Sequence, residues 1–176
     1  GAFLAAVRWS LLLATKSEKT KIINVYPINL IGQFFSTFLP GVVTGDFLKL
    51  LYIKDIDKDL NKSFLLSTVL IDIIIGLIGL IIVSGLSSIY FYTDLVSLSP
   101  KMKPLLSFNI MLLVGAAIFI LILFLPDNFK KRVIDLFNIV PIIGEKLASI
   151  ISTFWKIGES KAAVLKPLAI SICIHL

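Results

Sequence analysis

Cysteine and histidine are almost absent from this 176-residue chain. Cys173 is the only cysteine and His175 the only histidine, which excludes a disulfide bond within the chain. The two residues are two apart, so a helix would point them to different faces, and they form neither a metal site nor a cysteine–histidine nucleophile. A glycine-rich phosphate loop after a strand is missing as well. The sequence therefore predicts no metal, no cofactor and no catalytic residue.

Charge is also scarce. Charged residues make up 16% of the chain, against about 25% in a typical soluble domain. Hydrophobic residues make up 57%, and the mean hydropathy is +0.99. The net charge of +6 is spread over loops between apolar runs, which favours an anionic lipid surface as partner and not a nucleic acid.

Two apolar runs are long enough to cross a bilayer. Residues 63–91 hold one charge in 29 positions, and residues 105–125 hold none in 21. A span needs about 20 such residues, and runs of this length argue against the alternative of buried helices in a soluble core. We predict an all-α, polytopic integral membrane protein.

Three other segments add to the predicted membrane topology. We expect residues 1–14 to be the tail of a transmembrane helix and residues 162–176 the start of another, so that the sequence is an internal fragment of a longer protein. Residues 142–159 predict an amphipathic helix on the membrane interface, anchored by Trp155. A solvated loop helix is the alternative for that segment.

The basic residues predict the topology, because lysine and arginine accumulate on the cytoplasmic side. If residues 23–52 cross the membrane zero times or twice, 13 basic loop residues lie inside and 2 outside; a single crossing gives 10 against 5. Thirty residues are too few for two full crossings. We therefore predict a re-entrant pair of half-helices over residues 23–52, with Pro40 and Gly41 at its apex and Gly45 just beyond.

Polar residues gather on either side of this break. Asp46 and Lys49 are three apart and share a helix face, and Asp72 lies near the middle of the span 63–91. A charge at mid-bilayer costs about 2.5–3.5 kcal/mol, so it usually faces a partner or a cavity. The predicted headgroup-binding residues are Asn29, Gln33, Ser36, Thr37, Asp46, Lys49 and Asp72.

The sequence leaves more than one choice of ion-pair partner for these charges. Lys49 is the natural candidate partner for Asp46 or for Asp72. In the purely structural alternative, Asp46 and Lys49 neutralise one another at the interface, while Asp72 is protonated or bonded to Thr68.

Three stretches fall in a recognisable order: VRWSLLL (7–13), IGQFFSTFLPGVVTGDFLKLLYI (31–53) and STVLIDIIIGL (67–77). Together they resemble the lysylphosphatidylglycerol synthase transmembrane family, a flippase-like membrane domain. The residues that match the family's motifs are Arg8, Trp9, Gly32, Gln33, Leu39, Pro40, Gly41, Gly45, Asp46, Asp72 and Gly76.

The sequence also departs from the family's pattern. Thr44 replaces a glycine, Ser36 stands where asparagine is common, and Ile73 replaces an arginine. Lys49 stands where arginine is usual, which keeps the charge but loses the bidentate fork that suits phosphate.

The resemblance implies translocation of an anionic or aminoacylated phospholipid across the inner (plasma) membrane, without catalysis by this chain. One alternative is a membrane-embedded transferase acting on a lipid-linked sugar, with Asp46 or Asp72 as its base. Another is a channel or a structural membrane subunit, which the lack of a charged ring or filter sequence disfavours. Expected partners are membrane phospholipid, a second copy of the chain, or a fused or neighbouring transferase domain.

Overall fold

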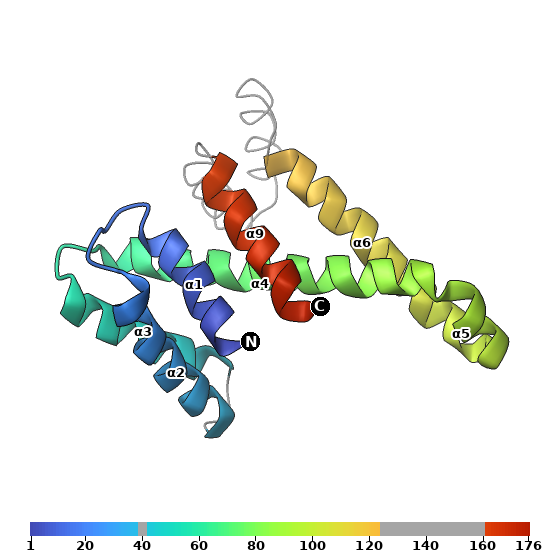
Figure 1. The fold of residues 1–176 in the computed structure, drawn as a ribbon, viewed down its shortest axis with the longest axis horizontal. Coiled ribbons are helices and arrows are strands. Elements are labelled where there is room, and N and C mark those ends of the chain that lie inside the picture. The colour runs from blue at the N-terminus through green and yellow to red at the C-terminus, as the bar shows by residue number, and fades with distance from the viewer. Residues whose placement is uncertain (39–41, 124–160) are drawn as a thin grey trace, which may run out of the picture.

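The structure is a computed structural model, and it describes residues 1–38, 42–123 and 161–176. Every regular element in these residues is helical, which confirms the predicted all-α fold (Figure 1). The elements are α1 (Ala2–Leu13), α2 (Ile22–Phe38), α3 (Val42–Ile56), α4 (Lys62–Tyr90), α5 (Tyr92–Leu98), the 3₁₀ turn η1 (Pro100–Met102), α6 (Lys103–Leu123) and α9 (Lys161–His175). The predicted interfacial helix 142–159 and its Trp155 lie outside the described residues.

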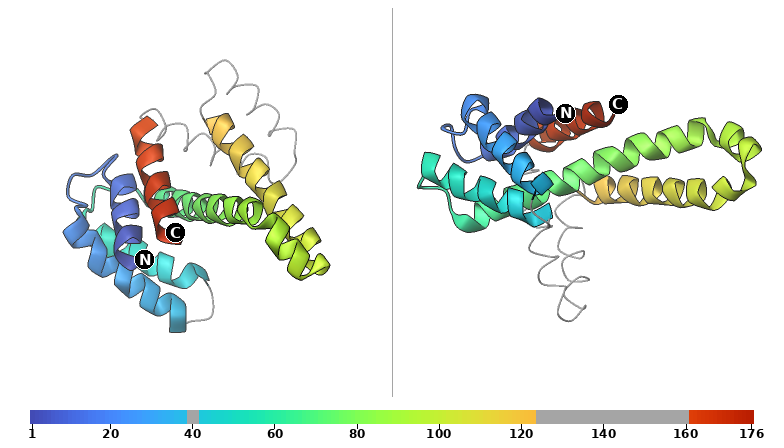
Figure 2. Two further views of the ribbon diagram at one scale, coloured as in Figure 1. Left: turned by 45° about the vertical axis from the view of Figure 1, so that its right-hand side comes forward. Right: turned by 90° about the horizontal axis from the view of Figure 1, so that it is seen from below.

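Helix α4 is the longest described helix and packs against α1, α3, α5, α6 and α9. Its 29 residues extend about 43 Å, enough to cross the roughly 30 Å hydrocarbon core. The segment Pro100–Ile122 is the second helix long and apolar enough to span a membrane. Helix α6 runs back beside the second half of α4 and forms a hairpin with α5 at its tip (Figure 2). The two long helices coincide with the two predicted spans.

The first half of α4 belongs to a bundle with α1, α2, α3 and α9. Its larger apolar cluster joins α1, α2, α3 and α4 and includes Trp9, which is 1% exposed. A smaller cluster of Leu12, Ile71 and Ile75, with Leu168 packed against it, joins α1, α4 and α9. Burial of such large side chains fixes the relative positions of these helices.

Helices α2 and α3 form a close antiparallel pair (Figure 1). A Cβ atom added to Gly45 would collide with the Ser36 hydroxyl and with the Gly32 backbone, so glycine permits this approach. The helices have 17 and 15 residues, about 25 and 22 Å, which is shorter than the hydrocarbon core. These lengths suit a re-entrant pair, whose depth in a membrane stays a prediction; Pro40 and Gly41, its predicted apex, lie outside the described residues.

The loops 15–22 and 53–62 lie in contact at one end of the bundle. The Ser17 hydroxyl donates to Asp57 Oδ2 at 2.6 Å, and Lys19 Nζ lies 3.4 Å from Asp57 Oδ1. The Ser17 hydrogen bond holds the pKa of Asp57 below its usual value, and the hydrogen bond to Asp57 raises the pKa of Lys19. This contact puts both loops at the same end of the bundle, as an even number of crossings by residues 23–52 requires.

Candidate membrane-embedded polar site

Five helices (α1, α2, α3, α4 and α9) line a cavity of about 340 Å³ that is open to the surroundings. Its apolar walls come mainly from α4, with Ile73, Leu77 and Leu80. Its polar lining consists of Arg8, Asn29, Gln33, Asp46, Lys49, Asp72 and His175. A cavity with convergent polar groups among apolar helices is the default place to look for a binding site.

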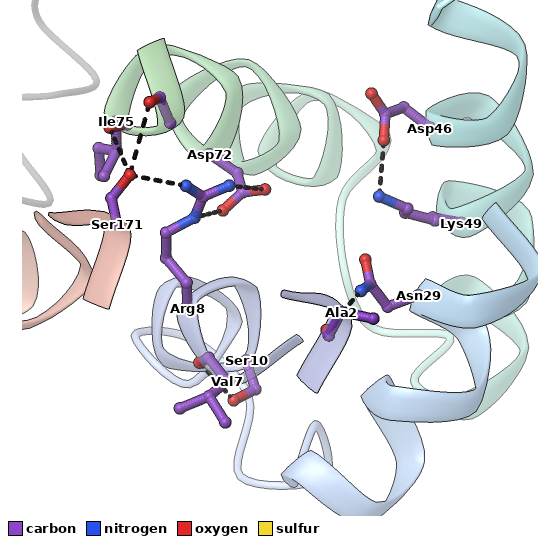
Figure 3. Close-up of polar contacts among 11 residues, drawn as sticks. Ala2, Val7, Arg8, Ser10, Asn29, Asp46, Lys49, Asp72, Ile75 and Ser171 are labelled. Carbon is purple, nitrogen blue, oxygen red and sulfur yellow. Dashed lines mark hydrogen bonds and ion pairs between the residues drawn. The ribbon is translucent and has the colours of Figure 1, made fainter. Parts of the chain in front are cut away.

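Asp72 forms a two-point ion pair with Arg8 of α1 (Figure 3). Arg8 Nε donates to Asp72 Oδ1 at 2.6 Å and Nη2 donates to Oδ2 at 3.0 Å. The Arg8 and Asp72 side chains are 9% and 16% exposed. Such bidentate, charge-assisted pairs are stronger and more directional than neutral hydrogen bonds.

Helix α9 joins this pair through Ser171. Arg8 Nη1 donates to Ser171 Oγ at 3.1 Å, and the Ser171 hydroxyl donates to the Ile75 carbonyl at 3.1 Å. Gly76 leaves room for the guanidinium, since a Cβ atom there would lie 3.0 Å from Arg8 Nη1. One arginine therefore connects α1, α4 and α9.

Of the two partners left open for Lys49, the structure shows Asp46. The alternative bond from Asp72 to Thr68 was wrong, because Asp72 pairs with Arg8 and the Thr68 hydroxyl donates to the Leu65 carbonyl at 2.8 Å. Arg8 was missing from the predicted site because it lies 64 positions away from Asp72, beyond the reach of helical spacing. Its signals in the sequence were its position as a lone base in the apolar run 1–14 and its match to the family motif in VRWSLLL (7–13).

Asp46 and Lys49 form the second ion pair, within α3. Lys49 Nζ lies 2.7 Å from Asp46 Oδ1, and the two side chains are 11% and 18% exposed for Lys49 and Asp46. The ammonium also lies 5.7 Å from the centroid of the Trp9 ring, within range of a cation–π interaction. The two ion pairs lie on opposite sides of the cavity (Figure 3).

The four polar residues predicted on α2 divide into two groups. Asn29 and Gln33 line the cavity, and Asn29 Nδ2 donates to the Ala2 carbonyl at 3.1 Å. Ser36 and Thr37 are not among its lining residues: Ser36 lies against Gly45, and the Thr37 hydroxyl donates to the Gln33 carbonyl at 3.0 Å.

The cavity contains as many positive as negative paired side chains. Arg8 and Lys49 balance Asp46 and Asp72, so the four groups sum to zero charge. Buried pairs of this kind are tolerated only while both members are present, because removal of one leaves an uncompensated charge. In the parts of the chain that the structure describes, no group of three His, Cys, Asp or Glu side chains is placed to hold a metal ion.

Comparison with known proteins decides the family. The family model described as "Lysylphosphatidylglycerol synthase TM region" matches residues 1–176. The chain belongs to this family. It has no match among the curated proteins or among the solved structures with which it was compared. The resemblance inferred from the motifs is thus confirmed, and the chain is a multi-pass integral membrane region of the lysylphosphatidylglycerol synthase type.

The motif residues of the lysylphosphatidylglycerol synthase region converge in space. Arg8, Gln33, Asp46, Asp72 and Gly76 come from four helices, and all of them line the polar cavity. Trp9 and Gly32, which also match the motifs, lie against the Lys49 side chain. Seven of the eight motif residues that the structure describes therefore lie at or beside one site, and the eighth, Gly45, lies against Ser36 and Gly32 of α2.

Proposed function

We propose that the chain is a lipid-translocating unit that moves an anionic or aminoacylated phospholipid across the inner (plasma) membrane. The observation that carries this proposal is the open polar cavity, with its two ion pairs, among helices that are otherwise apolar. A lipid headgroup must pass about 30 Å of hydrocarbon. A cavity that replaces the water around the headgroup, while the acyl chains stay in lipid, lowers that barrier.

Lys49 is the best candidate for binding the lipid phosphate. Arg8 is already engaged by Asp72 and by Ser171, whereas the Lys49 ammonium has three donors and one carboxylate partner, Asp46, among the described residues. When a phosphate binds Lys49, Asp46 becomes available for an amine of the headgroup. With an aminoacylated headgroup, which carries both charges, this exchange of partners leaves the cavity without an unpaired charge.

The other predicted binding residues take supporting roles in this proposal. Asn29 and Gln33 would hydrogen-bond the headgroup inside the cavity, and Asp72 would hold Arg8 in place. Ser36 and Thr37 are exposed further along α2 and would line the path beyond the cavity.

The ion pairs favour translocation over sugar transfer. A transferase needs a carboxylate free to accept a proton from its substrate. Both carboxylates that line the cavity, Asp46 and Asp72, already lie within 2.7 Å of a cation. Their engagement suits charge neutralisation better than proton abstraction.

The test is lipid exchange in liposomes. The protein is reconstituted with a fluorescent phosphatidylglycerol, and a membrane-impermeant reductant reports how fast the inner-leaflet label reaches the outside. We expect wild type to exceed empty liposomes and Lys49→Gln to slow exchange about tenfold, the loss of one charge-assisted hydrogen bond. Lys58→Gln, an exposed loop change, should retain the wild-type rate. Wild-type exchange no faster than empty liposomes would refute the proposal.

A further inference from the structure

A second cavity lies apart from the polar site, between the end of α3 and the beginning of α4. It has a volume of about 290 Å³ and is lined by Leu50, Leu51, Lys54, Lys62, Leu65 and Leu66. Four leucines form its walls, and the only polar side chains that line it are two lysines. None of these residues lines the polar cavity. We call this cavity the leucine–lysine groove.

The two lysines of the groove are unpaired within the described residues. Neither Lys54 nor Lys62 forms an ion pair there, whereas Lys19 and Lys49 both do. Two cations beside each other repel unless an anion lies between them. The groove therefore offers charge complementarity to an anionic ligand.

The order of residues along the groove matches the order of groups in a phospholipid. Lys62 is the first residue of the membrane-spanning helix α4, and Lys54 lies in the last turn of α3. Leu65 and Leu66 lie about one turn further into α4, and Leu50 and Leu51 about one turn back along α3. Positive charge thus lies at the end of the span, where lipid phosphates lie, and apolar surface lies deeper.

We propose that the leucine–lysine groove binds an anionic phospholipid of the surrounding leaflet. The phosphate lies between Lys54 and Lys62, and one acyl chain packs on the leucines. Basic pockets between membrane helices on the cytoplasmic side hold anionic headgroups in this way. A zwitterionic lipid binds more weakly, because its ammonium group opposes the two lysines. This site does not depend on lipid translocation by the polar cavity.

Native mass spectrometry of the full chain tests the proposal. The protein in detergent is titrated with phosphatidylglycerol or with phosphatidylcholine of the same acyl chains, and the retained lipid is counted. We expect phosphatidylglycerol to be preferred, and Lys54→Gln with Lys62→Gln to weaken its binding at least fivefold. The matched control, Lys21→Gln with Lys58→Gln, removes the same charge from exposed positions outside the groove. Equal effects of the two double variants would overturn the proposal.

Three further measurements distinguish lipid binding in the groove from phosphate binding alone and from binding in the polar cavity. Leu51→Trp fills the groove without a change of charge and should also weaken phosphatidylglycerol binding. Glycerol 3-phosphate, which lacks acyl chains, should not displace the lipid; displacement would reduce the groove to a phosphate site and overturn the proposal. In a Lys49→Gln background, which removes the proposed phosphate ligand of the polar cavity, Lys54→Gln with Lys62→Gln should still weaken phosphatidylglycerol binding at least fivefold; unchanged binding there would place the lipid outside the groove and overturn the proposal.

Discussion

The helix bundle and the α4–α6 hairpin differ in the contacts that hold their helices together. The bundle of α1, α2, α3, α9 and the first half of α4 holds both apolar clusters and both ion pairs of the polar cavity. The hairpin, formed by the second half of α4 with α5 and α6, has no ion pair in the described residues. In its second span, Pro100–Ile122, only 11% of an 18-residue apolar window is buried. Its helices meet through the close contact of Gly85 with Leu113 and through Asn109, which bonds to Ser84 and Ser88.

This difference shows where the chain can hold charge. In a bilayer, apolar surface gains little by leaving lipid, so helices associate through close packing and interhelical polar contacts. The hairpin exposes leucine, isoleucine and phenylalanine side chains, which suit lipid. The bundle can hold the four charges of the polar cavity because each one meets a partner there. Perturbations of the two regions should therefore differ in size and, in one case, in sign.

The largest effect should follow loss of the Arg8–Asp72 pair. Asp72→Asn leaves the Arg8 guanidinium buried without a carboxylate, and we expect a destabilisation of about 3–5 kcal/mol. The double variant Arg8→Gln with Asp72→Asn should recover part of that loss. Unfolding in detergent, followed by circular dichroism, measures Asp72→Asn, Arg8→Gln and the double variant. A double variant whose loss equals the sum of the single losses would show that the pair contributes nothing.

Replacing a glycine by alanine should change the free energy of unfolding in opposite directions in the bundle and in the hairpin. Gly45→Ala pushes a methyl group into Ser36 and the Gly32 backbone, and we expect it to cost about 1–3 kcal/mol. Gly115→Ala on α6 meets open space, so the better helix propensity of alanine should stabilise by up to about 1 kcal/mol. The same unfolding measurement applies to both. Destabilisation by Gly115→Ala as large as that by Gly45→Ala would remove the distinction between bundle and hairpin.

Loss of the polar contact in the hairpin should have a smaller effect. Asn109→Ala removes its bonds to Ser84 and Ser88, at 3.3 and 3.2 Å, and interhelical bonds of this kind are worth about 0.6 kcal/mol. Unfolding of this variant in detergent checks the estimate. A loss as large as that of Asp72→Asn would mean that the hairpin depends on buried polarity as much as the bundle does.

The smallest effect concerns the loop contact at the end of the bundle. The pKa of Asp57 is held below its ordinary value of 3.8, so its ionised form stabilises the fold above that pH, and the contribution disappears as pH falls through the lowered pKa. Lys19, with a raised pKa, contributes below 10.5 and loses its contribution as pH rises through the raised pKa. The difference in melting temperature between wild type and Asp57→Asn should be constant near neutral pH and shrink in acid. A difference that grows in acid would contradict this assignment.

Sequence patterns predicted some of these features well. The apolar runs 63–91 and 105–125 place α4 and α6 within two residues at each end, because membrane spans depend on local composition. The Asp46–Lys49 pair follows from a spacing of three within one helix.

Other features depend on contacts between distant segments. The Arg8–Asp72–Ser171 contacts join three helices, and no periodicity within one helix encodes them. The position of Ser36 against Gly45 likewise depends on how closely α3 approaches α2, which a helical face alone does not reveal. The family motifs carried part of this tertiary information, since five of their described residues, from four helices, line the cavity.

Photo-crosslinking tests most directly the claim that the bundle holds a lipid headgroup while the hairpin contacts acyl chains. A diazirine-bearing amino acid replaces Gln33, an exposed residue that lines the cavity, or Ile118, which is exposed on α6. After irradiation in phosphatidylglycerol-containing liposomes, tandem mass spectrometry locates the bond on the captured lipid. The account predicts headgroup adducts at position 33 and acyl-chain adducts at position 118. Acyl-chain adducts at both positions would contradict it.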